Sequence, residues 1–579
     1  MLDITETDLG FEVKFTYRQW IVDAIKQIPG SRYLGPTLKS WMVPKESETA
    51  LFNWAQRFNN TKPVTKSSGI GEIDPMPDLT IDVPLRMPMF PFQAQGVAYN
   101  LIHKRNIIGD DPGLGKTVQA IASSIAANRK CTLIICPNTL KENWKTEIEK
   151  KWSTRKAIIL SEKCKNTWPA FIDVGMAQYI ICNYESLKKY FVDHIDVHLD
   201  AEGNKKPLRL NHIHFKETVK LIDCVIIDEA HKCKDGKTQQ AKFVMGIARG
   251  KEYVWPITGT ALVNKPADLI PILHIMNRLE EFGNYKGFVN MYCQGMAQAS
   301  NLQHLRYMLH KHCFYRRRKK DVLKDLPDKL RTVVTCEISN QDEYNKAEAD
   351  LAKYMKENMG KSDDEISISM RGELMVKFGV LKKIAARGKL EQVIEYVKEI
   401  NDAGEKMIMF AWHIDVVKDL YKNLPGSLTI IGEDSLEARN SNIYSFQRCK
   451  KCGVKHEDHK NLDHDHEPSD IKNMICNIAA GGVGITLTAS SRVGFIEEPW
   501  HPAGQEQCED RVHRIGQKEC VESTHFVGVG TVDEYIYDII EAKRTITNQV
   551  LNGDTPPDAV EMDVVKELFN KFKTKFNFE

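Results

Sequence analysis

Short apolar runs separated by helical patterns are the main structural signal in the first half of the chain. Apolar runs end at Ile108, Cys136, Cys182, Ile227 and Ile257, and amphipathic stretches lie between them. A strand buried in a parallel sheet reads as such a run, and the connection to the next parallel strand is usually a helix. This part of the chain is therefore expected to form a parallel α/β sheet.

A second series of the same kind begins near Lys389. Strands are predicted over residues 407–410, 428–431, 474–478 and 493–496, with a helix over 414–424. Residues 340–381 read as long, helical and charged, and would suit a connector between two lobes. The fold class expected from these patterns is α/β, with two parallel-sheet lobes and helical insertions.

The N-terminal segment follows a different pattern. Phe11, Val13, Phe15 and Tyr17 alternate as in a half-buried strand, and a hairpin is predicted over residues 33–43. Helices are predicted over 18–28 and 46–58, so this segment reads as a small α+β domain. Residues 59–84 are rich in Pro, Gly, Ser and Asp, which is typical of a linker.

Bulk composition narrows the class of protein. The chain has 579 residues, a net charge of only +2 and 14 cysteines, with 42% apolar and 27% charged residues. Any contact with DNA must therefore come from local basic patches. Scattered cysteines favour a reducing compartment. The acidic N-terminus does not resemble a signal peptide, and no apolar run would span a bilayer. An intracellular protein, cytoplasmic or nuclear, is expected.

A glycine-rich loop follows the first apolar run. Its sequence is Gly109-Asp110-Asp111-Pro112-Gly113-Leu114-Gly115-Lys116-Thr117. A strand, such a loop and a helix start together form a phosphate cradle, in which Lys116 reaches the outer phosphates and Thr117 holds Mg²⁺. Asp110 stands where the strict pattern has glycine. The alternative is a glycine turn before a surface helix.

An acidic motif, Asp228-Glu229-Ala230-His231, follows the run that ends at Ile227. Ligands of open α/β sheets bind at the carboxyl ends of strands. Asp228 is placed to hold Mg²⁺, and Glu229 to orient and deprotonate the attacking water. The alternative is an ordinary acidic helix N-terminus.

Basic residues occur at two further points. Arg511 and Arg514 are three apart, so on a helix they would share a face, and arginine binds phosphate bidentately. These two are candidate fingers on the γ-phosphate, and the alternative is an exposed basic face. The run Arg316 to Lys320 is either a solvated face or a contact with the DNA backbone.

Several of these segments together resemble a known family. Between about residues 85 and 543 the chain resembles the Swi/Snf-like ATPases of helicase superfamily two. The matching segments are Gln93, Asp110 to Gln119, Asp228 to His231, Thr258-Gly259-Thr260, Arg317 to Leu323, Gly481 to Leu487 and Trp500 to Gln517. The last ends in Asp-Arg-x-His-Arg-Ile-Gly-Gln, the most specific motif. Departures are Pro112 for methionine, Thr258 for serine and Ala261 for proline.

The resemblance implies a DNA-dependent ATPase with two RecA-like lobes that bind ATP and Mg²⁺ between them. Gln93 would read adenine, and the second lobe would supply Arg511 and Arg514 on closure. DNA would lie across both lobes, and hydrolysis would move the enzyme along duplex without separating its strands. Because an arginine finger contributes roughly 10³–10⁵ in rate, hydrolysis would depend on closure.

The N-terminal segment resembles the HARP domain through Phe11, Tyr17, Lys26, Tyr33, Trp41 and Val43. That domain accompanies ATPases that rewind DNA and remodel forks, so branched DNA is the expected partner. The expected organisation is a HARP-like module at 1–60, a linker at 61–84, lobe one at 85–335, a connector at 336–388, lobe two at 389–551 and a tail at 552–579.

A Cys/His-rich insertion at 448–469 lies inside the second lobe. Cys449-x-x-Cys452-Gly453 is typical of a zinc knuckle, and His456, His459, His464 and His466 follow closely enough to complete the site, with His456 and His459 the first choice. The alternative is a polar loop with adventitious metal affinity. Residues 462–466 also resemble the core of a phage junction-resolving endonuclease, but that family needs a second Cys-x-x-Cys, and none is present. A motor with an attached nuclease, a strand-separating helicase and a non-catalytic scaffold are the competing functions.

Overall fold

A computed structural model of the chain shows how these elements are arranged. It describes residues 2–7, 9–15, 19–35, 40–55, 65–66, 73–199, 203, 206–259, 266–294, 298–299, 301–358, 368–459, 464–482, 484–552 and 564–577. By their contacts, the residues fall into two units. The first comprises Met1–Asp111, Gly115–Arg317 and Thr547–Glu561, and the second comprises Pro112–Leu114, Arg318–Ile546 and Met562–Glu579.

The first unit is built on a parallel sheet of seven strands, as predicted. In spatial order the strands are β16 (Phe314–Tyr315), β6 (Ile107–Ile108), β13 (Tyr253–Ile257), β12 (Cys224–Asp228), β7 (Thr132–Cys136), β9 (Tyr179–Asn183) and β8 (Ala157–Ile159). Every residue of β7 is buried. Because full burial of one Leu or Ile side chain contributes about 1.5–3 kcal/mol, such strands dominate the core.

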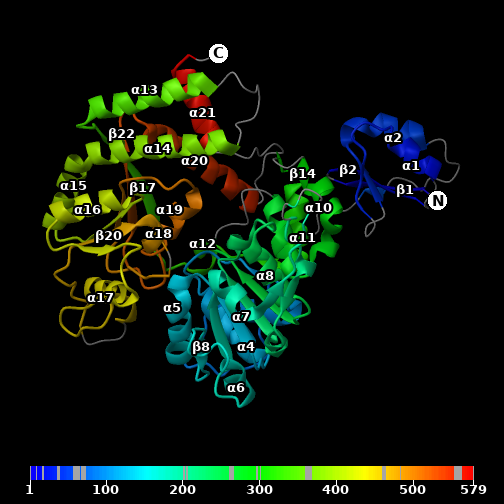
Figure 1. The fold of residues 1–579 in the computed structure, drawn as a ribbon, viewed down its shortest axis with the longest axis horizontal. Helices are drawn as coiled ribbons and strands as arrows, with labels where there is room; N and C mark the ends of the chain where they lie inside the picture. Colours follow the sequence, from blue (N-terminus) through cyan, green and yellow to red (C-terminus); the bar gives the residue numbers. More distant parts are fainter. Residues whose placement is uncertain are drawn as a thin grey trace. The chain divides into compact units, whose positions relative to one another are not determined.

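Helices surround this sheet (Figure 1). They are α3 (Pro91–His103), α4 (Lys116–Ala126), α5 (Lys141–Thr146), α6 (Trp168–Asp173), α7 (Leu187–Phe191), α8 (Gln239–Ala248), α9 (Leu269–Ile275), α10 (Asn284–Tyr292) and α11 (Leu302–His312). Two short hairpins accompany them, β10 (Val192–Ile195) with β11 (Ile213–Phe215) and β14 (Cys293–Gln294) with β15 (Gln298–Ala299). No helix in the described ranges is long and apolar enough to cross a bilayer.

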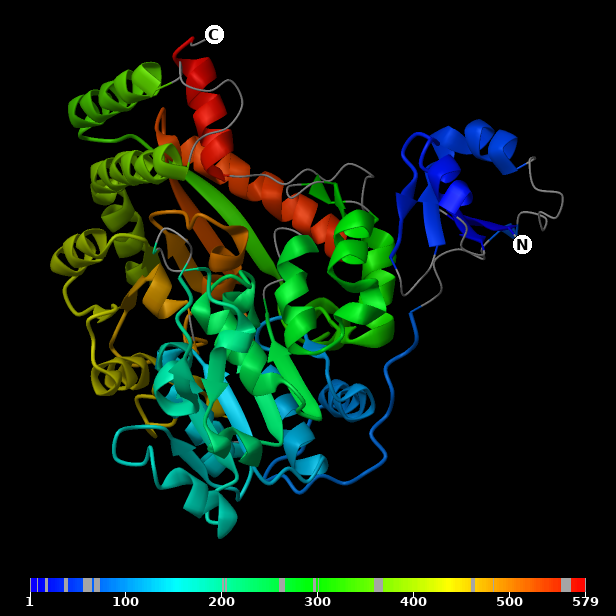
Figure 2. The same ribbon diagram turned by 45° about the vertical axis from the view of Figure 1, so that its right-hand side comes forward.

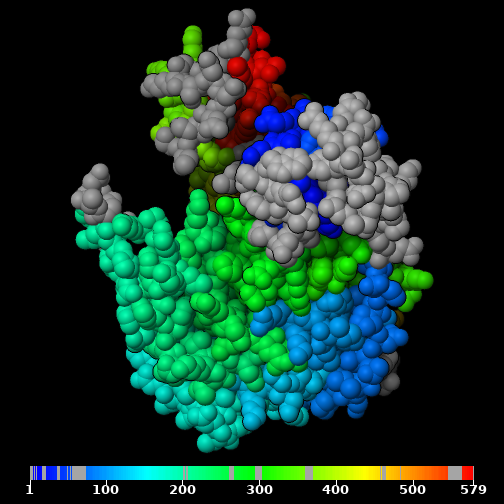
Figure 3. All heavy atoms as spheres, turned by 90° about the vertical axis from the view of Figure 1, so that its right-hand side faces the viewer, coloured from blue at the N-terminus to red at the C-terminus, as the bar shows by residue number. Residues whose placement is uncertain are grey.

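The N-terminal module is an α+β fold, as expected. Its strands are β1 (Leu2–Thr7), β2 (Gly10–Phe15), β3 (Arg32–Tyr33), β4 (Ser40–Val43) and β5 (Thr65–Lys66), and its helices are α1 (Gln19–Ile25) and α2 (Glu48–Ala55). The module contacts α10, where Arg32 donates to the Asn290 carbonyl at 3.0 Å. Its blue atoms lie against green atoms of the first unit in Figure 3. Tyr17 falls outside the described residues.

The second unit has its own parallel sheet of six strands. In spatial order these are β17 (Lys329–Cys336), β22 (Val521–Gly528), β21 (Arg492–Phe495), β18 (Met407–Ala411), β20 (Asn473–Asn477) and β19 (Leu428–Ile430). β17 precedes the expected connector, yet it pairs along its whole length with β22. From sequence this strand is expected in lobe one, because β17 mixes apolar residues with Lys329, Arg331 and three threonine or cysteine residues and so lacks the continuous apolar run of a central strand.

The helices of the second unit include the predicted connector. They are α12 (Lys319–Val322), α13 (Gln341–Asn358), α14 (Ile368–Gly388), α15 (Leu390–Asp402), α16 (Ile414–Asn423), α17 (Leu436–Gln447), α18 (Ile478–Gly481), α19 (Pro502–Glu509), α20 (Val532–Asn552) and α21 (Val564–Lys575). Within the predicted connector, α13 and α14 run side by side (Figure 2). They share one buried core with α20 and α21.

Candidate functional site

The glycine-rich loop lies between β6 and α4, the context a phosphate cradle requires. Gly113 and Gly115 have φ angles of 88° and 79°, which glycine adopts without strain. A Cβ on Gly115 would also lie 2.4 Å from the Gln93 amide nitrogen, so this position has no room for a side chain. Lys116 opens α4, and its Nζ donates to the Asp110 carbonyl at 2.7 Å.

Asp110 is fully buried and stabilises the loop through side-chain hydrogen bonds. Its Oδ1 accepts from the backbone N–H and the Nε of Arg317 at 2.9 and 3.0 Å, and its Oδ2 accepts from Gln119 Nε2 at 2.9 Å. Gln119 in turn accepts from the Tyr315 hydroxyl at 2.8 Å. This network requires a carboxylate, which gives a physical reason for aspartate at the position where the strict motif has glycine.

The basic run from Arg316 to Lys320 is largely paired with acids. Burial contradicts the alternative of a solvated face for Arg316, Arg317 and Lys319, whereas the Arg318 side chain is 37% exposed, and the contact with the DNA backbone stays a prediction. Arg316 binds Asp111 at 2.9 Å, Arg317 binds Asp110, Arg318 binds Asp321 at 2.7 Å and Lys319 binds Asp510. Sequence alone does not show these partners, because some of them are about 200 residues away.

The carboxylates of Asp228 and Glu229 lie at the end of β12, two strands from β6 in the same sheet. Trp144 Nε1 donates to Asp228 Oδ2 at 2.8 Å and fixes that side chain. Burial, together with the neighbouring charge of Glu229, raises the pKa of Asp228 to about 7. A cation bound here would favour the ionised form, so the site suits a metal ion. Trp144 had no assigned role in the sequence analysis.

Lys116 connects the two motifs. Burial lowers the pKa of its ammonium group, and the charges of Asp110, Glu229, Asp111 and Asp228 oppose that shift. The lysine therefore lies near acids from the loop and from the end of β12. The third motif begins at Thr258, which is buried and donates its N–H to the Ile108 carbonyl at 3.2 Å. Thr260 and Ala261 fall outside the described residues.

In the second unit, Arg511 and Arg514 lie in the turn after α19, which ends at Glu509. The expected helical face is therefore wrong in detail, but the two side chains still converge. Both guanidinium groups donate to the Ile485 carbonyl, at 3.4 and 3.0 Å, and that of Arg514 also donates to Thr486 Oγ1 at 2.7 Å. A 3₁₀-like turn aligns residues three apart. The arginines thus contact the segment Gly481 to Leu487, which is the second glycine-rich turn of the sequence.

A buried carboxylate, that of Glu509, anchors the turn that carries Arg511 and Arg514. Glu509 is fully buried and accepts from Arg331 Nε and Nη2 at 2.7 and 2.6 Å and from Lys329 Nζ at 2.7 Å. Burial opposes ionisation, but the two cations hold the pKa of Glu509 well below its usual range. No local pattern reveals this anchor, because both cations lie on β17, about 180 residues away along the chain.

The cysteines of the insertion lie beside two of the four candidate histidines, one of which, His459, is a first-choice ligand. Ligand atoms of Cys449, Cys452, His459 and His464 all lie within 4.8 Å of one another. Predicted ligand His456 is not part of this group, and its Nδ1 instead forms a hydrogen bond with Thr488 Oγ1 at 2.9 Å. His464 lies beside the cysteines instead, and its position depends on how the loop folds rather than on its spacing from Cys452 along the sequence.

Comparison with known proteins places residues 92–387, more than half of the chain, in the SNF2-related domain family. The SWI/SNF-related matrix-associated actin-dependent regulator of chromatin subfamily A-like protein 1 homolog of Caenorhabditis elegans is 27% identical over 95% of this chain and 76% of its own length. The human DNA annealing helicase and endonuclease ZRANB3 is 26% identical over 81% of this chain and 41% of its own length.

Among solved structures, the Sulfolobus solfataricus SWI2/SNF2 ATPase core in complex with dsDNA is 23% identical and covers 82% of this chain and 96% of that chain, with a TM-score of 0.37. The chain spans only part of the curated relatives, from 41% of human ZRANB3 to 76% of the C. elegans protein. The family match covers the loop, the acidic motif and the basic run. The chain belongs to the SNF2-related family, which confirms the resemblance to Swi/Snf-like ATPases that its motifs indicated.

Proposed function

We propose that this chain is an ATP-driven motor on DNA that reanneals or remodels branched duplex rather than separating its strands. The observation that carries the proposal is the meeting of two motifs around Lys116, the loop after β6 and the carboxylates after β12. Relatives support the choice of substrate, since the human protein is named a DNA annealing helicase and endonuclease.

In this proposal the first unit binds and hydrolyses the nucleotide. Residues Asp110 to Thr117 cradle the phosphates, with Lys116 on the outer ones, and Gln93 contacts adenine. Thr117 and Asp228 hold Mg²⁺, which neutralises phosphate charge when bound. Glu229 orients and deprotonates the attacking water. The raised pKa of Asp228 fits a site that is completed by a cation, since a bound cation would favour the ionised carboxylate.

The second unit supplies Arg511 and Arg514 to the γ-phosphate when DNA draws the lobes together. A ligand that prefers the closed state shifts the population toward it, so DNA would stimulate hydrolysis. We further propose the organisation expected from the sequence, with a HARP-like module ahead of two RecA-like lobes. We also propose that the insertion binds zinc through Cys449 and Cys452, in addition to ATP and Mg²⁺ at the motor site.

The decisive experiment measures ATP turnover without DNA and with single-stranded, duplex and forked DNA. Lys116→Ala should abolish turnover, and Glu229→Gln should retain nucleotide binding while stopping hydrolysis. Lys163→Ala, at an exposed lysine away from the site, is the matched control and should behave like wild type. Wild-type turnover in both site variants would show that the site assignment is wrong.

Two further measurements separate the competing functions. Arg511→Ala and Arg514→Ala should retain nucleotide affinity but lose the DNA-stimulated rate, and undiminished stimulation would contradict the two-lobe mechanism. A fork substrate assayed for reannealing, unwinding and cleavage distinguishes the motor from a strand-separating helicase and from a nuclease. Reannealing without cleavage is expected.

A further inference from the structure

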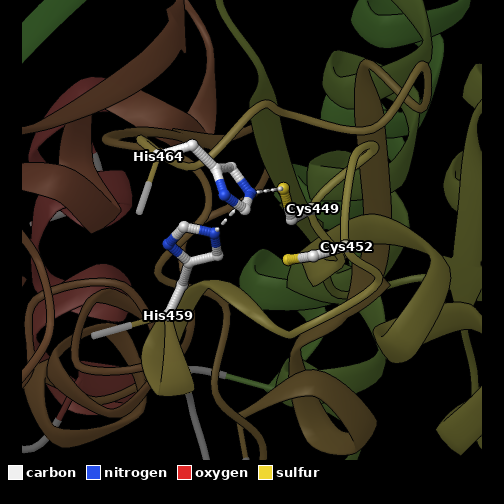
Figure 4. A group of neighbouring side chains, drawn as sticks. All are labelled: Cys449, Cys452, His459 and His464. Atoms are coloured by element: carbon white, nitrogen blue, oxygen red, sulfur yellow. Dashed lines mark hydrogen bonds between the residues drawn. The ribbon is translucent and has the colours of Figure 1, made fainter. Parts of the chain in front are cut away.

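The Cys/His group of the insertion has the arrangement of a closed metal site. In Figure 4 the side chains of Cys449, Cys452, His459 and His464 point toward one another from separate parts of the insertion. Cys449 and His459 are almost fully buried, at 1% and 6% exposure, whereas Cys452 is exposed. The four ligand atoms therefore converge on one place, with Cys449 and His459 on its buried side and Cys452 on its solvent side.

The distances match the edges of a tetrahedral zinc site. His459 Nε2 lies 3.4 Å from His464 Nε2, and His464 Nε2 lies 3.8 Å from Cys449 Sγ. With Zn–N of about 2.0–2.1 Å and Zn–S of about 2.3 Å, a tetrahedron has N···N edges of about 3.3 Å and N···S edges of about 3.5 Å. Exposed Cys452 needs only a small movement to complete the fourth vertex, because no pair of ligand atoms is more than 4.8 Å apart.

The local backbone is folded as a knuckle around the first cysteine. Gly453, with φ of 75°, allows its N–H to donate to the Cys449 carbonyl at 2.9 Å, and the Cys449 N–H donates to the Val454 carbonyl at 2.7 Å. The Glu467 N–H donates to Cys449 Sγ at 3.4 Å. Such an outer hydrogen bond orients a metal-binding thiolate. Two sulfur and two imidazole ligands in a tetrahedron favour zinc.

Another residue of the insertion, together with Gln447 just before it, forms hydrogen bonds with Thr488 and Ala489 of the second lobe. His456 bonds Thr488 Oγ1, and the Ala489 N–H donates to Gln447 Oε1 at 2.8 Å. His466 Nε2 contacts the Gln447 carbonyl at 3.1 Å. Residues 488–490 directly follow the turn on which Arg511 and Arg514 rest. Fixing the insertion would therefore also fix the base of that turn.

We propose that Cys449, Cys452, His459 and His464 bind one structural zinc ion, and that this ion holds the insertion against Thr488 and Ala489. The inference rests on the zinc binding proposed above and adds its two histidine ligands and its role. A set of four protein ligands leaves no open position, so the ion does not activate water. His464 is then a ligand rather than part of a nuclease site.

Zinc content of the purified full-length chain, measured by mass spectrometry after a wash with a mild chelator, tests the ligand set. About one zinc per chain is expected. Cys452→Ser and His464→Asn should each lower zinc affinity roughly tenfold or more, and neither side chain is fully buried, so folding should survive. Exposed Cys520 and His456, which lies outside the ligand group, provide matched controls. The variants Cys520→Ser and His456→Asn should keep the zinc.

The possible outcomes test zinc binding, the ligand set and the structural role of the ion separately. Wild type without zinc would overturn zinc binding itself, whereas loss in His456→Asn with retention in His464→Asn would overturn only the ligand set. Neither result depends on ATP turnover. Cobalt substitution adds a second readout, because thiolate charge-transfer absorption should weaken in Cys452→Ser. Hydrogen exchange at Ala489 should accelerate when zinc is removed, and unchanged exchange would overturn the bracing role.

Discussion

A single methyl group at Gly96 should weaken the network beneath the phosphate loop. Gly96 is buried in α3, and a Cβ there would lie 2.0 Å from Gln119 Oε1, 2.8 Å from Arg317 Nη2 and 2.9 Å from the Tyr315 hydroxyl. The Gln119 amide must therefore move away in Gly96→Ala. It cannot move without giving up the hydrogen bonds that Tyr315 and Arg317 donate to it at 2.8 and 2.9 Å.

The size of the effect follows from two opposing contributions. Loss of these bonds costs about 1 kcal/mol for the neutral donor and about 1.5–3 kcal/mol for the charged one. Alanine in a helix interior is favoured over glycine by about 1 kcal/mol, which offsets part of the loss. The net destabilisation should be about 1.5–3 kcal/mol, which corresponds to roughly a ten- to hundredfold increase in local opening of α4.

Hydrogen exchange of the α4 amides, followed by mass spectrometry, measures this opening. Gly372→Ala is the matched control, because that helical glycine is exposed and a Cβ there has no neighbour within 4 Å. The control should leave exchange of α4 unchanged and slow exchange of its own helix, α14. Nucleotide affinity should fall in Gly96→Ala only. If α4 exchanges at the wild-type rate in that variant, the network does not support the loop.

Three further changes test other buried groups. Burial lowers the pKa of Lys406 to about 7, from about 10.4 in the unfolded chain. Between these pH values unfolding takes up a proton, so the free energy of unfolding rises with pH. In urea unfolding, the free energy of unfolding should rise from pH 7 to pH 9 by about 2 kcal/mol more in wild type than in Lys406→Met. Glu509→Ala leaves Arg331 and Lys329 without their shared carboxylate and should cost about 3–5 kcal/mol by the same assay, with Glu509→Gln less affected. Trp144→Phe removes the hydrogen bond to Asp228 and should raise the Mg²⁺ concentration needed for half-maximal ATP turnover by roughly tenfold, whereas an unchanged requirement would contradict the positioning role.

The parts of the fold that were predictable from sequence are those with strong local signals. β7 and β12 are apolar except for Thr132 at the start of one and Asp228 at the end of the other, because both faces of their sheet are covered, so their composition alone identifies them. β17 alternates half-buried and exposed residues, and its identity depends on pairing with a strand nearly 200 residues later. A local pattern contains no information about such a partner.

The same distinction applies to the candidate site. Lys116 and Asp228 belong to short motifs, and the structure places these motifs at strand ends of one parallel sheet, as predicted, while their chemical roles stay predictions. The hydrogen bond of Trp144 and the position of His464 beside the cysteines depend on how separate segments fold together. His456 and His464 are equivalent as ligand types, and only the course of the chain decides which one faces the cysteines.

The neighbours of the cations near the second glycine-rich turn suggest which of them are suited to bind phosphate. Lys319 and Arg331 are paired with buried carboxylates, so phosphate could bind them only at the cost of separating a buried ion pair. Arg511 and Arg514 donate instead to carbonyl and hydroxyl oxygens. Exchanging a neutral acceptor for phosphate makes a hydrogen bond roughly twice as strong, so this exchange is favourable. We therefore expect Lys319 and Arg331 to serve as scaffold, and Arg511 and Arg514 to exchange these oxygen contacts for an anion.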